Sequence, residues 1–124
     1  MARKVRDIRW LDAPRAQNYP AALSYLSLLY PATRARALVA KLRRARVTTF
    51  KAKDIFRASS LSSLGVSNAR VKRDREMIAE GTPLSPILLV RDAVHGTVVI
   101  ADGYHRLCAI YSYNEDAEIP CQIV

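Results

Sequence analysis

The residues best suited to bind or transform a ligand lie in one short stretch, ADGYHRLCA, at positions 101–109. It places a carboxyl group (Asp102), a glycine and an imidazole almost consecutively after an apolar run. Glycine lets an anion approach the backbone closely, and the first N–H groups and positive dipole end of a helix attract it. A guanidinium holds phosphate through parallel hydrogen bonds. The residues predicted to bind phosphate are Gly103, Tyr104, His105 and Arg106.

Each of these side chains also has a structural alternative. Arg106 can form an ion pair with Asp102 or Glu115, and His105 can hydrogen-bond a backbone carbonyl. Asp102 is expected to cap the helix that follows, the commonest role of aspartate in this setting. If the protein transfers a phosphoryl group, Asp102 and His105 are the candidate catalytic residues. Tyr104 either covers a bound base or shields the turn, and the sequence leaves open whether the protein is an enzyme.

This chemistry requires a strand before the glycine and a helix after it. The apolar run 86–90 is typical of a strand buried on both faces, and residues 97–100 predict a second strand of the same hairpin. Residues 104–113 are predicted to be helical, and residues 119–124 to form a closing strand. Pro120 lacks an N–H donor, so that last strand is expected to lie at an edge or to begin there.

The earlier part of the chain is predicted to be mostly helical. Apolar residues recur there at spacings of three and four, and Pro31 and Gly81 are suitable helix ends. The expected elements are helices from residue 20 to 30, from residue 32 or 33 to about 46 and from 69 to 80, a strand at 47–50, a short helix or turn within 51–61 and a loop at 64–68.

Charge is distributed unevenly along the chain. Residues 1–75 contain 18 Lys and Arg against 4 acids, a net +14, whereas residues 76–124 contain 2 against 7, a net −5. Two interpretations remain open: the basic half contacts the phosphates of a nucleic acid, or its charge faces the acidic half and solvent. The residues that would contact nucleic acid are Arg34, Arg36, Lys41, Arg43, Arg44 and Arg46.

Other features argue against membrane, disulfide and metal chemistry. No apolar run approaches the roughly 18 to 20 residues of a membrane span, and no signal peptide is recognised, so a cytoplasmic protein without a membrane partner is expected. Cys108 and Cys121 are then expected to be reduced. Together with His95 and His105 they match no zinc-binding spacing, so no metal site is predicted.

The last part of the chain, residues 76–124, resembles the ParB and sulfiredoxin superfamily. The shared features are a helix ending in glycine, a strand opening with Pro-Ile, a hairpin, a Gly-x-His-Arg turn into a helix and a closing Ile-Pro strand. The turn reads Gly-Cys-His-Arg in sulfiredoxins and Gly-Glu-Arg-Arg in ParB proteins, so Gly103 and Arg106 match both. The Asp-Gly-x-His-Arg form is similar to that of small bacterial ParB-like proteins.

This resemblance implies an α/β (α+β) fold, with a small mixed sheet of the ParB/sulfiredoxin type at 47–124. A basic helical extension, residues 1–46, is expected to pack on it. The resemblance also implies a nucleotide, ATP or CTP with Mg²⁺, at the Gly-x-His-Arg turn, and Arg57 as a further phosphate ligand. Tyr104 stands where sulfiredoxins have their catalytic cysteine, so their reaction is not expected. A third possibility is an interaction domain that binds no nucleotide.

Overall fold

The computed structural model describes residues 7–62, 65 and 68–124 of the 124-residue chain. These residues form five helices and a four-stranded mixed sheet, an α+β fold, as the sequence predicted. The elements in chain order are α1 (Asn18–Leu29), α2 (Ala32–Arg44), β1 (Thr48–Lys51), α3 (Ala52–Ser59), α4 (Ala69–Glu80), β2 (Ile87–Asp92), β3 (Thr97–Asp102), α5 (Tyr104–Tyr113) and β4 (Glu118–Ile123).

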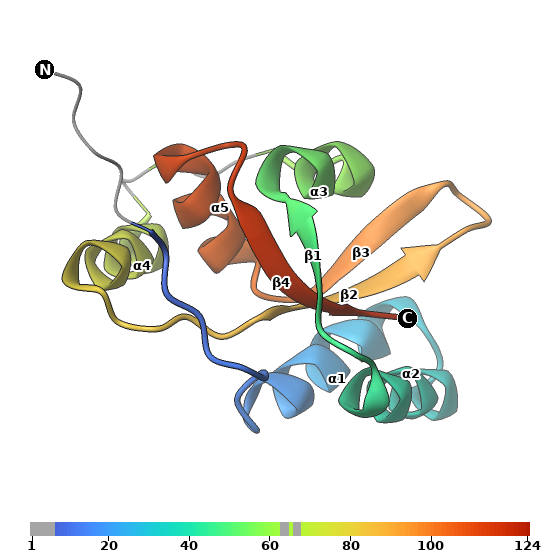
Figure 1. The fold of residues 1–124 in the computed structure, drawn as a ribbon. Coiled ribbons are helices and arrows are strands. Elements are labelled where there is room, and N and C mark those ends of the chain that lie inside the picture. Colours follow the sequence, from blue (N-terminus) through green and yellow to red (C-terminus); the bar gives the residue numbers. More distant parts are fainter. Residues whose placement is uncertain (1–6, 63–64, 66–67) are drawn as a thin grey trace, which may run out of the picture.

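The strands lie in the order β1-β4-β2-β3 (Figure 1). The predicted hairpin of β2 and β3 is confirmed, whereas β4 runs parallel to β2 and antiparallel to β1. The expected edge position of β4 is therefore wrong. Pro120 is tolerated inside the sheet because it lies opposite Thr49 of β1, and pairing with β2 begins only at Cys121. Its missing N–H falls before the ladder to β2 starts.

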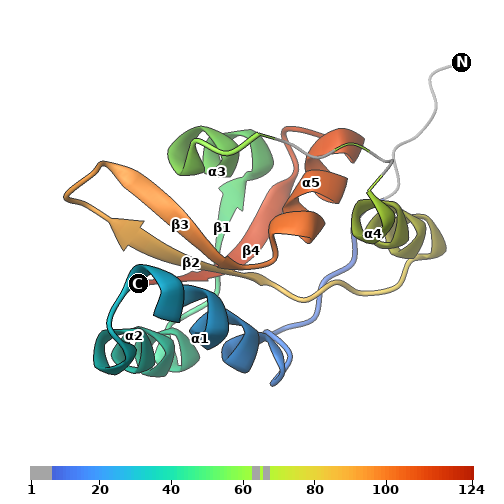
Figure 2. The same ribbon diagram turned by 180° about the vertical axis from the view of Figure 1, so that it is seen from behind.

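Helices cover both faces of the sheet (Figures 1 and 2). α1 and α2 pack on one face, α3 and α5 lie on the other, and α4 packs against α5. Strand β2 contributes alternate residues to the two apolar clusters: Ile87 and Leu89 to the α3/α5 side, Leu88 and Val90 to the α1/α2 side. All four are buried, which confirms the prediction of a strand covered on both faces.

The helices of the first layer follow the predicted apolar spacing. Helix α2 buries Leu38, Val39 and Leu42, whereas in α1 Leu26 is buried and Leu29, three residues later, is half exposed. α1 begins at Asn18, two residues before the predicted start at Pro20. Proline is tolerated at position 20 because the backbone amides of the first helical turn have no hydrogen-bond acceptor within the helix.

Helix α4 has the predicted bounds and recognisable ends. The Asn68 side chain accepts hydrogen bonds from the amides of Arg70 and Val71, and Gly81 ends the helix with φ 77°. Of the loop predicted at 64–68, residues 64, 66 and 67 lie outside the described residues. None of the helices in the described chain is both long and apolar enough to cross a membrane.

The segment before α1 runs beside the segment that enters β2. Trp10 forms a bridge with Leu84, the Leu11 amide donates to the Leu84 carbonyl at 2.8 Å, and the Leu84 amide donates to the Arg9 carbonyl at 2.9 Å. These contacts bring Arg15, far away in sequence, close to the start of α5.

Candidate anion-binding site

Gly103 makes the turn between β3 and α5 possible. Its φ of 107° lies in the left-handed region that side chains disfavour. A Cβ atom at this position would also lie 2.9 Å from Arg106 Nη2 and 2.9 Å from Ile87 Cγ1. The position therefore needs glycine for its backbone conformation and for the close approach of two neighbours. Strand, glycine turn and helix follow one another as predicted.

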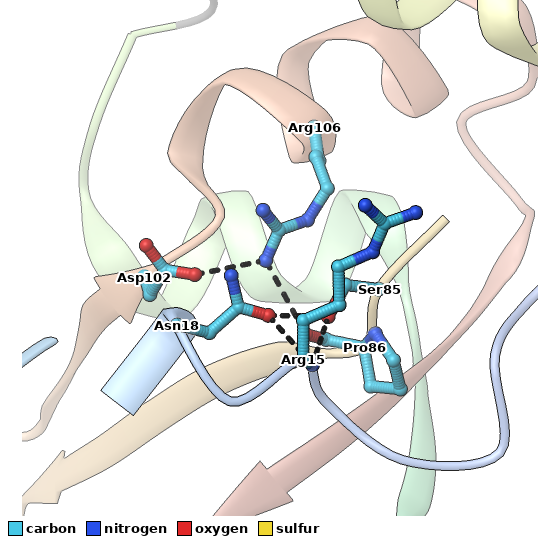
Figure 3. Close-up of polar contacts among 6 residues, drawn as sticks. All are labelled: Arg15, Asn18, Ser85, Pro86, Asp102 and Arg106. Atoms are coloured by element: carbon cyan, nitrogen blue, oxygen red, sulfur yellow. Dashed lines mark hydrogen bonds and ion pairs between the residues drawn. The ribbon is translucent and has the colours of Figure 1, made fainter. Parts of the chain in front are cut away.

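Asp102 and Arg106 form an ion pair across this turn (Figure 3). Arg106 Nη2 donates to Asp102 Oδ2 at 3.0 Å and to the Pro86 carbonyl at 3.3 Å. Helix α5 has Gly103 as its N-cap and no side-chain capping bond, so the expected capping role of Asp102 is wrong. The carboxylate instead pairs with the guanidinium four residues on, which is the structural alternative open from the sequence.

The guanidinium of Arg106 is only partly satisfied by these contacts. Its side chain is 17% exposed, yet the Nε atom is buried and has no hydrogen-bond partner among the described residues. A buried donor without a partner costs about 1–3 kcal/mol. Arg106 is therefore held at the start of α5 with one donor of its guanidinium unpaired among the described residues.

A cavity of about 300 Å³ opens beside this ion pair. Its wall combines the segment before α1, the start of α1, one face of α4, residues 83–85 and the β3–α5 turn. Four arginines line it against two aspartates, and His105 lies in the same wall. The charged residues of the wall are Arg15, Arg70, Arg73, Asp74, Asp102 and Arg106.

The start of α5 adds backbone donors to this positive wall. The first hydrogen bond of the helix runs from the Leu107 amide to the Gly103 carbonyl at 2.9 Å, so the amides of residues 104–106 precede the helical ladder. Such amides and the helix dipole both favour an anion. The first amides of α1 are already bonded, that of Asn18 to the Arg15 carbonyl at 3.0 Å, so α1 contributes its dipole alone.

A small buried network positions Arg15. The Arg15 amide donates to Ser85 Oγ at 3.0 Å and to Asn18 Oδ1 at 3.1 Å, and the Ser85 hydroxyl donates to Asn18 Oδ1 (Figure 3). Asn18 and Ser85 are both buried. This network joins residues 15–18 to the segment before β2 and holds the Arg15 backbone in the cavity wall.

Asp74 is the second carboxylate of the cavity. Burial raises the pKa of Asp74, and the positive charges of Arg106, Arg73, His105 and Arg70 act in the opposite direction. Burial has the larger effect, so ionisation of Asp74 is disfavoured relative to an exposed carboxyl. A protonated Asp74 would leave the cavity more positive.

The sequence did not single out the α4 residues of this wall. A signal was present, because residues 70, 73, 74 and 77 are spaced i, i+3, i+4, i+7 and so share one face of the predicted helix. Three charged side chains and a methionine on one helix face can indicate the wall of a binding site. Which face of α4 meets α5 depends on tertiary packing.

Tyr104 and His105 lie in the first turn of α5 and line the cavity. The Tyr104 hydroxyl donates to the Ser62 carbonyl, and the Tyr104 and His105 rings meet edge-on with centroids 5.5 Å apart. Burial raises the pKa of Tyr104, with a smaller contribution from Cys108. Both rings line the cavity, so Tyr104 shields the turn while remaining within reach of a ligand.

The two cysteines are buried thiols and not part of the cavity wall. Burial raises the pKa of Cys121 to about 12, which makes its thiol unreactive at neutral pH. Among the residues that the structure describes, no group of three or more His, Cys, Asp or Glu is arranged to hold a metal ion.

Arg57 lies away from this site. It is on the outer side of α3, with a side chain that is 84% exposed and 3.9 Å from Asp54, and it is not part of the cavity wall. The inward positions of α3 are taken by Ile55 and Phe56. The structure therefore brings residues 103–106 together with Arg15, Arg70 and Arg73, and leaves Arg57 outside.

The basic residues of the second helix form a separate surface. All six are exposed, and none lines the cavity. The guanidinium of Arg43 lies over the Tyr19 ring, 4.5 Å from its centroid.

Comparison of the chain with protein-family models, with curated proteins and with solved structures finds no match. Function is therefore inferred from the geometry and charges of the chain itself.

Proposed function

We propose that the cavity at the start of α5 binds the phosphate groups of a nucleoside phosphate or a similar small phosphorylated ligand. The observation that carries this proposal is the convergence of four arginines on one concave site that also contains a helix N-terminus. Arginines that line one concave site repel one another, and an anion between them offsets that repulsion. A bound phosphate relieves that repulsion.

Each part of the wall has a role in this proposal. The amides of residues 104–106 and the guanidinium groups of Arg70 and Arg73 contact phosphate oxygens, Arg15 closes the opposite side, and Asp102 holds Arg106 in position. The volume of about 300 Å³ is at the small end of ligand cavities. The phosphates therefore occupy the cavity, and any nucleoside lies toward Tyr104 and His105.

The resemblance to the ParB and sulfiredoxin superfamily supports the same ligand class. That superfamily binds ATP or CTP at the turn that corresponds to residues 103–106 here. If Mg²⁺ accompanies the nucleotide, Asp74 is the carboxylate positioned to meet it, since Asp102 is engaged by Arg106. His105, in the wall of the same cavity, is then a residue that can move a proton.

Calorimetric titration with ATP, CTP, GTP and inorganic pyrophosphate, with and without Mg²⁺, tests the proposal. Arg73→Gln removes one charge from the cavity wall and is expected to weaken binding tenfold or more, because a charge-assisted phosphate contact is worth about 1.5–3 kcal/mol. Lys72→Gln is the matched control: Lys72 lies next to Arg73 on α4, is exposed and is not in the wall.

Two outcomes would overturn the proposal. One is the absence of binding by every phosphate compound, which would favour the interaction domain without a nucleotide. The other is an equal loss in both variants, which would show general charge attraction instead of a site.

A further inference from the structure

A second surface of the protein, on α2, has a geometry and charge suited to a different ligand. The 13-residue helix Ala32–Arg44 contains five Lys and Arg and no acidic residue, and Arg46 follows it. All six basic side chains are exposed. This surface is named the basic face of α2 below.

Helical spacing arranges these charges in two rows. With about 100° between successive residues, Ala35, Leu38, Val39 and Leu42 form the buried side. The basic pairs flank the opposite side, Arg34 with Lys41 along one edge and Arg36 with Arg43 along the other. The ridge between these two rows is formed by Thr33, Ala37, Ala40 and Arg44, all exposed.

The positive charge of this face is not neutralised within the protein. Among the described residues, none of the six takes part in an ion pair, and the one ion pair that joins residues 1–75 to the acidic part of the chain is Lys53 with Asp116. Contact with the acidic half therefore does not account for the charge of α2, which is exposed to solvent.

One of these side chains is held in place by the core. Arg43 stacks on Tyr19, whose hydroxyl donates to Gln122 Oε1 at 2.7 Å, and Gln122 Nε2 donates to the Ala45 carbonyl at 2.9 Å. Ordering a long side chain before binding lowers the entropy lost when it binds.

We propose that α2 lies in the major groove of duplex DNA and binds the phosphates on both sides of it. A helix with its side chains is about 10–12 Å wide, which matches a groove about 12 Å wide. The small ridge residues allow close approach, and the two basic rows then face the two backbones. Within each row the two basic residues are seven positions, or about 10.5 Å, apart along the helix axis. This inference is independent of the anion cavity.

The same geometry favours DNA over two other polyanions. The major groove of A-form RNA is too narrow for a helix. A helix that binds an anionic membrane surface needs large apolar residues beside its basic side chains, and the ridge of α2 has none. The exposed leucines of this layer, Leu28 and Leu29, lie on α1. Arg44 is the single long side chain of the ridge, and so the only one there that can reach the edges of the DNA base pairs. Little sequence preference is therefore expected.

Fluorescence anisotropy with a labelled DNA duplex, measured over a range of KCl concentrations, tests this inference. Four phosphate contacts predict that log K falls with log salt with a slope of about −3.6. Arg36→Gln with Lys41→Gln, one change in each row, is expected to halve that slope and to weaken binding tenfold or more at low salt. Arg70→Gln with Arg73→Gln is the matched control, because it removes the same charge from the cavity.

The two double variants separate the two proposals. The α2 variant is expected to bind pyrophosphate like the wild type, and the cavity variant to keep the wild-type DNA slope. Thermal unfolding of both checks that they are folded. Equal weakening of DNA binding by the two variants, absence of DNA binding at low salt, or binding of phosphatidylserine vesicles or duplex RNA in preference to DNA would each overturn the inference.

Discussion

The cavity beside α5 and the basic face of α2 both present arginines, on a concave wall in the first region and on a convex helix in the second. In the cavity, four arginines line a concave space of about 300 Å³; Arg106 is 17% exposed and engaged by a carboxylate, whereas Arg15, Arg70 and Arg73 are exposed. On α2, the basic side chains project from a convex helix. All are exposed, and none forms an ion pair among the described residues. Low exposure strengthens the electrostatic interactions of Arg106, whereas water and salt weaken those of exposed arginines in both regions.

This difference decides what each region can recognise. A few charges held around a cavity suit a compact anion and depend on an accurately placed backbone. Charges spread along a helix suit an extended polyanion that meets several of them at once. The cavity is therefore expected to be sensitive to single substitutions, and the helix to lose its function gradually as charges are removed.

The largest effect is expected from Gly103→Ala, which disfavours the backbone conformation of the turn beside the cavity. The substitution combines a φ of 107° with contacts of 2.9 Å to Arg106 Nη2 and Ile87 Cγ1, and is expected to cost about 2–4 kcal/mol of unfolding free energy in urea denaturation. Gly96→Ala is the control, because Gly96 has φ 65° and open space around it, and should cost about 1 kcal/mol. Similar costs for both would refute the role of close packing.

Next in size is the effect of Asp102→Ala, which removes the carboxylate that holds Arg106. With both side chains 17% exposed, the loss is expected to destabilise the protein by about 2 kcal/mol, because a mostly buried guanidinium loses its partner. Asp54→Ala, in an exposed pair at 3.9 Å from Arg57, should leave the stability unchanged. A loss of the same size in Asp54→Ala would erase the distinction between buried and exposed charge pairs.

A moderate effect is expected from Asp74→Asn, which removes a partly buried negative charge from the cavity wall. Because the folded pKa of Asp74 is raised, the folded state binds this proton more tightly than the unfolded state. Its contribution to stability is therefore greatest at low pH and is lost as the pH rises from about 3.8 through the raised value. The variant should unfold at a higher temperature than the wild type at pH 7.

The same substitution should affect binding. Removing a negative charge from the cavity is expected to tighten pyrophosphate binding several-fold at pH 7, and to reduce the gain that the wild type shows on acidification. Calorimetry at two pH values measures both. Weaker pyrophosphate binding by Asp74→Asn would mean that the carboxylate itself contacts the ligand, through a proton or a metal ion.

The smallest effect is expected from Arg36→Gln on α2. Its side chain is exposed in the middle of the helix, so the free energy of unfolding should change by less than about 0.5 kcal/mol. The salt slope of DNA binding should fall by about 0.9. A large loss of stability would show that the basic face of α2 supports the fold.

Local features of the fold were predictable from the sequence. The bounds of α4 and α5, the hairpin of β2 and β3 and the glycine turn all depend on neighbouring residues: caps, apolar periodicity and the backbone freedom of Gly103. The position of β4 was not predictable, because a proline disfavours a central strand only where its N–H is required, and the register alone shows that pairing with β2 begins at Cys121.

The candidate site was predictable only in part. The sequence by itself determined the strand, the turn and the helix start, because their signals lie within a few residues. Tertiary structure alone decided that Arg15, Arg70, Arg73 and Asp74 share a cavity with that turn, and that Asp102 holds Arg106 instead of capping α5. The physical reason is that these contacts join segments distant along the chain, and packing of the apolar clusters determines which helix faces meet.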